Sequence, residues 1–218
     1  MHTKTYAPHI FLAWYVLWWS ILAVAPLDRK DWALENLLAL ALVGTLIATH
    51  RRFRFSSLSY LLITLFMSLH AVGAHYTYAE VPLGFWLKDI LSLSRNPFDR
   101  IVHFAFGFLL VYPLKELLVR TGSVRGFWAG YLPISGTLAQ SGLFELVEAV
   151  VAGIVSPDLG AAYLGTQGDE WDAQKDMAAA LAGAVLMTIL VGLFPKTFRI
   201  SPAAPDDPTS IPTSVKPY

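Results

Sequence analysis

Cysteine is absent from this chain of 218 residues. Its absence excludes a disulfide framework, a thiolate metal site and a cysteine nucleophile. A surplus of charge is also missing, because 16 Lys and Arg balance 16 Asp and Glu. The sequence therefore gives no basic surplus that would indicate nucleic acid as a partner, and no acidic surplus that would indicate a solvated tail.

Several signature motifs are missing as well. The sequence contains no P-loop, no dinucleotide-binding fingerprint, no nucleophile elbow and no H-E-x-x-H zinc motif. Internal repeats are not evident either. A functional site must therefore be sought in the placement of individual polar residues along the chain.

Apolar residues dominate the sequence. They make up 55% of it, charged residues only 15%, and the mean hydropathy is +0.51. Six segments approach the ~20 residues that a bilayer crossing needs. They predict an all-α, polytopic membrane protein with six transmembrane helices in a single domain, residues 1–199. The predicted segments are Pro8–Ala25, Trp32–Thr49, Phe55–Ala74, Arg100–Leu118, Gly126–Ile154 and Lys175–Phe194.

The distribution of basic residues predicts the orientation. Short-loop Lys and Arg fall on one side of the predicted spans, which the positive-inside rule makes cytoplasmic. Both termini are then cytoplasmic, and residues 76–99 and 155–172 form outer loops. The first loop carries Phe85, Trp86, Ile90 and Leu91 at helical spacing, typical of an amphipathic segment in the interface. Residues 200–218, rich in Pro, Ser and Thr, are predicted to be a disordered cytoplasmic tail.

Polar residues gather at the outer ends of three predicted spans. Three pairs stand three or four residues apart, so each pair projects from one face of its helix. The pairs are Asp99 with His103, Glu145 with Glu148, and Asp172 with Asp176. A charge on a lipid-facing surface costs several kcal/mol, so these residues are expected to face one cavity that opens to the outer leaflet.

Helix capping is the simpler explanation for part of this set. Asp169 fits an N-cap with Asp172 three residues later, and "NPFDR" fits Asn96 as a cap with Pro97 in the first turn. Asp176 and His103 lie about seven residues beyond these caps, roughly 10 Å into the helix, where capping does not reach. They require another role.

The functional interpretation assigns these residues to a site. His103, Asp99, Glu148 and Asp176 are candidate catalytic groups, and Arg100, Trp171, Gln167 and Gln174 are candidates for substrate binding. Glu145, Glu148, Asp172 and Asp176 are candidate ligands of a divalent cation such as zinc, manganese or magnesium. The expected partner is the lipid bilayer, with a lipid or lipid-linked headgroup as substrate. His70 and His75 lie close enough in sequence to the outer ends to be considered.

Two alternatives remain open at this stage. The same carboxylates suit a small ion- or proton-coupled transporter, although the inner half of the chain offers only Lys115 and Glu116 for a through-path. They also suit a structural protein in which Arg100 and Lys175 neutralise the acids and fix helix packing.

The chain resembles the YjdF-like family of bacterial inner-membrane proteins. The resemblance is carried by "FDRIVHFAFGFL" at Phe98–Leu109, "FELVEAVV" at Phe144–Val151 and "LGTQGDEWDAQKDMAAALAGA" at Leu164–Ala184, within a match from about His70 to Gly192. It implies a multi-pass fold in the bacterial inner membrane and names no activity.

A more distant resemblance is to VanZ-type membrane proteins, which are linked to teicoplanin resistance. Asp99, Arg100 and His103 fit that pattern, as do Glu145 or Glu148, and Asp176 with Gly183. Ala180 departs from it, because the pattern has Asn at this position.

Overall fold

A computed structural model describes residues 6–200 of the chain, and within them every regular element is a helix. The predicted all-α class is confirmed for this part of the chain. The predicted tail lies outside the described residues except for Ile200. The helices are α1 (Ala7–Leu22), α2 (Arg29–Thr49), α3 (Ser57–His75), α4 (Pro82–Ile90), α5 (Phe98–Thr121), α6 (Trp128–Ile154), α7 (Pro157–Leu164) and α8 (Asp172–Leu193).

Five of these helices, α2, α3, α5, α6 and α8, are long and apolar enough to cross a membrane. The first predicted span, Pro8–Ala25, corresponds to α1, which has 16 residues. At 1.5 Å per residue, α1 rises roughly 24 Å, short of a hydrocarbon core of about 30 Å. The six predicted spans are thus matched by five helices of spanning length and one shorter apolar helix.

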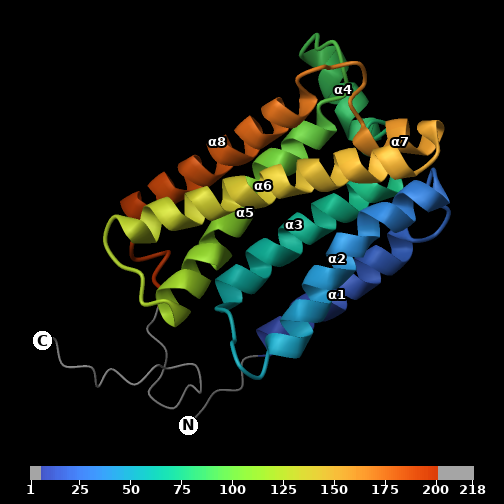
Figure 1. The fold of residues 1–218 in the computed structure, drawn as a ribbon. Helices are drawn as coiled ribbons and strands as arrows, with labels where there is room; N and C mark the ends of the chain where they lie inside the picture. Colours follow the sequence, from blue (N-terminus) through green and yellow to red (C-terminus); the bar gives the residue numbers. More distant parts are fainter. Residues whose placement is uncertain (1–5, 201–218) are drawn as a thin grey trace, which may run out of the picture.

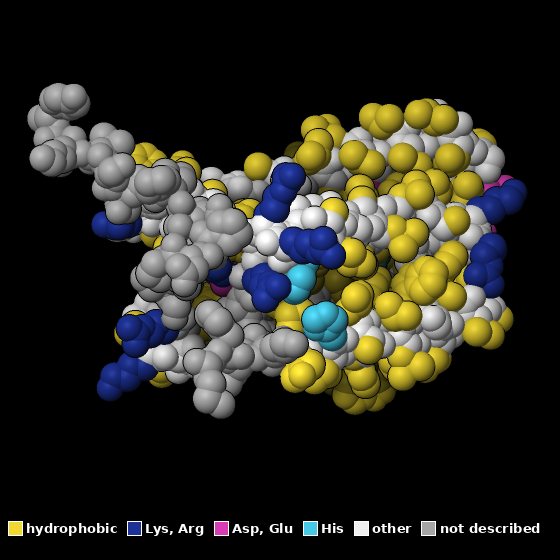
Figure 2. Space-filling view, turned by 90° about the horizontal axis from the view of Figure 1, so that it is seen from below, with side chains coloured by type: hydrophobic (Ala, Val, Ile, Leu, Met, Phe, Trp, Pro, Cys, Tyr) yellow, Lys and Arg dark blue, Asp and Glu magenta, His cyan; other side chains and the backbone are white. Residues whose placement is uncertain are grey.

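The long helices run side by side as an elongated bundle, with α4 and α7 together at one end (Figure 1). Helix α5 packs against α3, α6 and α8, while α1 and α2 contact α3. Hydrophobic side chains cover much of the surface seen in Figure 2, and Lys and Arg lie in small groups at both margins and near the middle of that view. We call the end where α5 and α8 begin the acidic end, and the end where α3 and α6 begin the basic end.

Helices α5 and α8 approach each other closely because small residues line their contact. A Cβ atom on Gly107 would collide with the Ala180 carbonyl group, and one on Gly183 would lie 2.7 Å from the Phe108 amide nitrogen. Close backbone approach through small residues is typical of membrane helix pairs. The contact fixes the two helices that carry Asp99, His103 and Asp176 at a short separation.

Two short helices occupy the connections at the acidic end. The first connection contains α4, whose Phe85, Trp86 and Ile90 side chains are exposed, and its place in the membrane interface stays a prediction. The second connection, predicted as a loop, instead contains α7. Pro157 in the first turn of α7 has the backbone angle that a helix start favours, and Gly165 ends α7 in the left-handed region at φ 59°.

Candidate functional site

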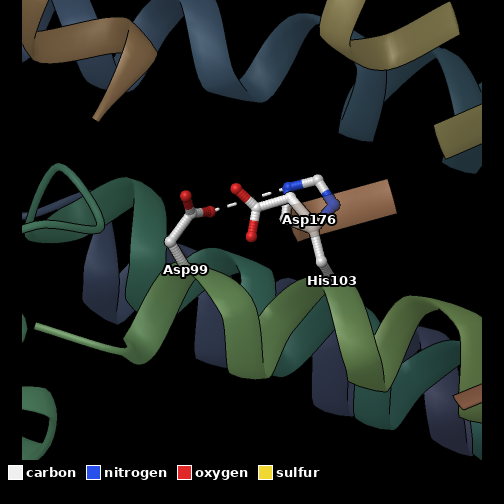
Figure 3. A group of neighbouring side chains, drawn as sticks. All are labelled: Asp99, His103 and Asp176. Carbon is white, nitrogen blue, oxygen red and sulfur yellow. Dashed lines mark ion pairs between the residues drawn. The ribbon is translucent and has the colours of Figure 1, made fainter. Parts of the chain in front are cut away.

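The first two turns of α5 and the first two turns of α8 position the centre of the candidate site. Asp99 and His103 project from α5 and Asp176 from α8, and their side chains point toward one another (Figure 3). One potential ligand atom from each residue can be chosen so that all three lie within 4.8 Å of one another. His103 and Asp176 are buried, and Asp99 is partly buried. The predicted convergence of these three residues is therefore present.

Helix α6 adds two carboxylates to this centre. The Glu145 Oε1 atom lies 3.6 Å from His103 Nε2, close to the 3.7 Å between His103 Nε2 and Asp99 Oδ1. The Phe144 ring meets the His103 ring edge to face, with centroids 5.8 Å apart, and holds the imidazole in place. Glu148 is buried and interacts electrostatically with Asp99, Glu145 and Asp176. All three predicted pairs therefore contribute to one region.

A layer of ion pairs lies between this centre and the acidic end. Arg95 binds Asp172 and lies 3.7 Å from Asp99, measured between Nη2 and Oδ2. Arg100 binds Asp169 and lies 3.3 Å from Asp172 Oδ1. These contacts connect the start of α5 to the start of α8. Arg95 and Arg100 thus both form ion pairs with carboxylates of the protein.

Asp169 lies in the connection before α8 and is the best-neutralised acid of this layer. Lys175 Nζ lies 2.7 Å from Asp169 Oδ2, and Arg100 binds the same oxygen. Lys175 first, and then Arg100, hold the pKa of the Asp169 carboxyl well below its usual value. Asp169 is therefore a charged partner of two cations.

The capping predictions need correction. Helix α8 begins at Asp172 with Trp171 at the N-cap position, and Asp169 accepts a hydrogen bond from the Trp171 amide at 3.1 Å without capping the helix. Helix α5 begins at Phe98, so Pro97 is its N-cap residue and lies before the first turn. Asn96 still accepts a hydrogen bond from the Phe98 amide at 3.0 Å, which is a local turn bond rather than a cap at N2 or N3.

Gln167, predicted to bind substrate, bonds instead to the backbone of the chain. Its Oε1 accepts from the Asn96 amide at 2.9 Å, and its Nε2 donates to the Asn96 carbonyl at 3.1 Å. Trp171 and Gln174 are exposed beside the start of α8. A substrate-binding role for these three residues stays a prediction.

The two additional histidines have local partners. His75 Nδ1 lies 2.7 Å from the Leu22 carbonyl oxygen, which ties α3 to the end of α1. His70 is buried and its Nδ1 bonds to the Tyr78 hydroxyl. Neither is among the three residues at the centre of the site.

Arg95 is the most important residue that sequence reasoning missed. It is buried, and it contacts Asp99 and Asp172 as well as the Thr166 carbonyl oxygen at 3.0 Å. It stands four residues before Asp99 but outside α5, which begins at Phe98, so helical spacing does not account for this contact.

Helix α2 brings a second missed pair toward the site. Asp31 and Glu35 are buried and four residues apart. Burial raises the pKa of Tyr78 well above its usual value, and the carboxylates of Glu35, Asp99 and Glu148 raise it further. Burial also raises the pKa of Tyr163 on α7, and the carboxylates of Glu35 and Glu148 raise it further. The carboxylates of Glu35 on α2 and Glu148 on α6 thus lie near the side chains of both Tyr78 and Tyr163.

Several buried polar atoms of the site accept no hydrogen bond from residues 6–200. Asp176 Oδ1 and Glu145 Oε1 are such atoms at the centre, and both oxygens of Asp31 and Glu35 Oε2 are such atoms on α2. For Asp176 Oδ1 the nearest cationic group is Arg100 Nε, 3.8 Å away. Buried oxygens of this kind are costly unless a cation, a proton or water satisfies them.

The donor set at the centre suits a divalent cation. One imidazole nitrogen and two or three carboxylate oxygens are ligands that zinc and manganese accept. Glu145 is placed to serve as a further ligand or as the acceptor that orients His103. The residues therefore fit a metal on chemical grounds as well as on spacing.

Comparisons with known proteins identify the family. Residues 7–197 match the model of a family described as "Predicted membrane protein (DUF2238)". The chain is 40% identical over 171 residues to "Inner membrane protein YjdF" of Escherichia coli (strain K12), which covers 77% of this chain and 80% of that protein. No solved structure matches the chain. The YjdF-like resemblance is confirmed, whereas the VanZ-type resemblance has no support here and stays a prediction. The chain belongs to the DUF2238 family of predicted membrane proteins.

Proposed function

We propose that this membrane protein binds a divalent cation through Asp99, His103 and Asp176, and that the cation holds the anionic headgroup of a lipid or lipid-linked molecule. The observation that carries the proposal is the set of three ligand atoms within 4.8 Å, contributed by two helices. An imidazole beside carboxylates favours zinc or manganese over magnesium, which prefers an all-oxygen shell.

The roles of the surrounding residues follow from their contacts. Glu145 lies within reach of His103 and fills a further coordination position or orients the imidazole. Glu148, buried beside them, would hold a proton next to the cation, and the cation would supply Lewis-acid chemistry there. Arg100 is the cationic side chain nearest to Asp176 and is partly exposed, so it would bind a phosphate of the same headgroup.

The site lies at the predicted outer side of a six-span fold with both termini in the cytoplasm. Exposed Trp171 stands directly before Asp172 and provides an apolar surface for the tail of an amphiphile. A headgroup reaching the start of α5 and α8 from the outer leaflet then meets the cation and Arg100 together.

Metal analysis of detergent-purified protein tests the proposal. Wild-type protein exposed to zinc and desalted should retain about one equivalent per chain. Asp176→Asn and His103→Gln should each reduce the retained metal to background. Glu116→Gln is the matched control, because Glu116 is a buried carboxylate on α5 whose partners are protein groups. Equal metal retention by wild type and Asp176→Asn would reject the site.

A second candidate function is ion- or proton-coupled transport. It is favoured by the buried, unpartnered carboxylates of Asp31 and Glu35, which extend the acidic groups from α8 across to α2. Uptake into proteoliposomes that is lost with both Glu35→Gln and Asp176→Asn would support transport. Metal binding without uptake would support the headgroup-binding function. Unchanged metal content and uptake in every variant would leave the packing role.

A further inference from the structure

A cavity lies at the basic end, on the opposite side of the bundle from the candidate metal site. It has a volume of about 320 Å³ and lies between α1, α2 and α3. This volume falls within the ~300–1,000 Å³ usual for small-molecule sites. Most of the wall is apolar and is provided by Phe11, Leu12, Val43, Leu46, Ile63 and Met67.

The mouth of this cavity is polar and basic. His9 and His50 border the cavity and also border a second hollow of about 260 Å³, which Arg54 lines as well. The His9 and His50 rings lie 6.0 Å apart. Within the part of the chain that the structure describes, no Asp or Glu lines either hollow. Figure 2 shows two His side chains beside Lys and Arg, where the apolar flank meets the basic end.

The electrostatic surroundings of His50 favour an anion. Burial lowers the pKa of His50, and the neighbouring Arg54 and then His9 lower it further. Within residues 6–200, Arg54 forms no ion pair with a carboxylate. A phosphate placed between Arg54, His50 and His9 would therefore meet an arginine that pairs with no carboxylate of the described residues, beside two imidazole rings that can donate hydrogen bonds.

The wall of the cavity also carries a polar atom without a partner among the described residues. Tyr15 is buried in its wall, and the Tyr15 hydroxyl has no hydrogen-bond partner among residues 6–200. Tyr15 follows His9 by six residues on α1, a rise of roughly 9 Å. A glycerolipid carries an ester carbonyl between its phosphate and its acyl chain, and this carbonyl would give the hydroxyl a partner.

We propose that this cavity binds one anionic phospholipid of the leaflet at the basic end. The phosphate lies between His9, His50 and Arg54, an ester oxygen reaches Tyr15, and the first part of one acyl chain fills the apolar wall. Charge complementarity at the mouth and apolar lining beneath it select an amphiphile of this kind over a free anion or a second copy of the chain. The proposal is independent of the cation site at the acidic end.

Lipid titration of delipidated protein in detergent tests this assignment, with native mass spectrometry as the readout. Phosphatidylglycerol should bind about fivefold more tightly than phosphatidylcholine of the same chain length, because one arginine near a membrane surface contributes about that much. Arg54→Gln should abolish the preference. Arg125→Gln, an exposed arginine in another connection at the same end, should retain it.

A second variant tests the tail-binding part of the cavity. Val43→Trp fills the wall and should weaken both lipids while the preference between them persists. Equal binding of the two lipids by wild type, or an unchanged preference in Arg54→Gln, would overturn the proposal. Inorganic phosphate that competes fully with phosphatidylglycerol would show a free-anion site and would also overturn it. Unfolding temperatures of all variants distinguish lost binding from lost folding.

Discussion

The two ends of the helix bundle hold buried carboxylates under opposite conditions: Glu116 lies on α5 at the basic end, and Asp176 lies on α8 at the acidic end. At the basic end, Glu116 is 2% exposed and accepts hydrogen bonds from the Ser56 amide at 2.8 Å, from the hydroxyls of Ser56 and Ser59, and from Arg120. At the acidic end, the Asp176 Oδ1 atom is buried and accepts none from residues 6–200.

This difference distinguishes two uses of a buried acid. Glu116 joins the start of α3 to the end of α5, and its partners offset the cost of removing it from water. At the acidic end, Asp176 Oδ1 and Glu145 Oε1 accept no hydrogen bond from the described residues. Such an arrangement lowers stability, and it is expected where these atoms bind a ligand. Because Glu116 is buried on protein partners alone, Glu116→Gln is the matched control for the metal-binding variants.

The largest expected effect is at Glu116. Glu116→Ala should lower the free energy of unfolding by about 3–5 kcal/mol, because Ser56, Ser59 and Arg120 lose their shared acceptor in a buried setting. Denaturant titration in detergent, followed by circular dichroism, measures the loss. Glu80→Ala, an exposed acid, should change the same quantity by less than about 0.5 kcal/mol. Similar losses of unfolding free energy in the two variants would show that the hydrogen bonds of Glu116 do not stabilise the fold.

The next effect concerns the acidic end and a bound cation. Zinc at 100 times its dissociation constant should raise the free energy of unfolding of the wild type by about 2.7 kcal/mol. Asp176→Asn should show no such gain, and Glu116→Gln should keep it. In the presence of a chelator, Asp176→Asn should be as stable as the wild type or more so, because a buried negative charge beside other carboxylates is removed. A clear loss of stability under chelator would assign Asp176 to packing.

A smaller effect is expected at the contact between α5 and α8. Gly107→Ala should lower the free energy of unfolding by about 1–3 kcal/mol, because the new methyl group meets the Ala180 carbonyl group. It should also weaken zinc retention, since α8 shifts away from Asp99 and His103. Gly44→Ala is the control, because its Cβ meets open space. That variant should gain about 0.5–1 kcal/mol from the restricted unfolded chain.

The smallest effect is a pH dependence at Asp169. Its folded-state pKa lies below its usual value of 3.8, so the contribution of Asp169 to stability is fully present above that pH and is lost as pH falls through the folded-state pKa. Asp169→Asn should flatten this part of the thermal stability profile between about pH 5 and pH 2. Glu170→Gln, an exposed neighbour, should follow the wild-type profile. An acid profile of Asp169→Asn that matches the wild type would contradict the assignment.

Helical spacing predicted most of the centre of the site. The pairs Asp99 with His103 and Glu145 with Glu148 could be placed on one face each, because residues three or four apart are neighbours on a helix. Charge in an apolar run then indicated that these faces meet inside the bundle. Both steps need only local sequence, and both agree with the positions found.

The remaining features depend on contacts between distant segments. Arg95 binds Asp172, 77 residues away, and no local pattern predicts that pairing. Asp31 and Glu35 had the right spacing, but Asp31 stood before the predicted start of the span at Trp32, whereas α2 begins at Arg29 and buries both. Helix α7 was missed because its glycines suggested a loop, although Gly160 lies against the Ala152 backbone, where a side chain would not fit.

The backbone contact between Gly107 and Ala180 has a consequence for the inheritance of this fold. Because the backbone of Ala180 occupies the space of a Cβ at Gly107, a change of side chain at position 180 cannot make room for one at position 107. Among descendants of a common ancestor, position 107 should therefore stay glycine wherever the spacing of the two helices is retained. A larger residue there would mark branches in which that spacing has been reset.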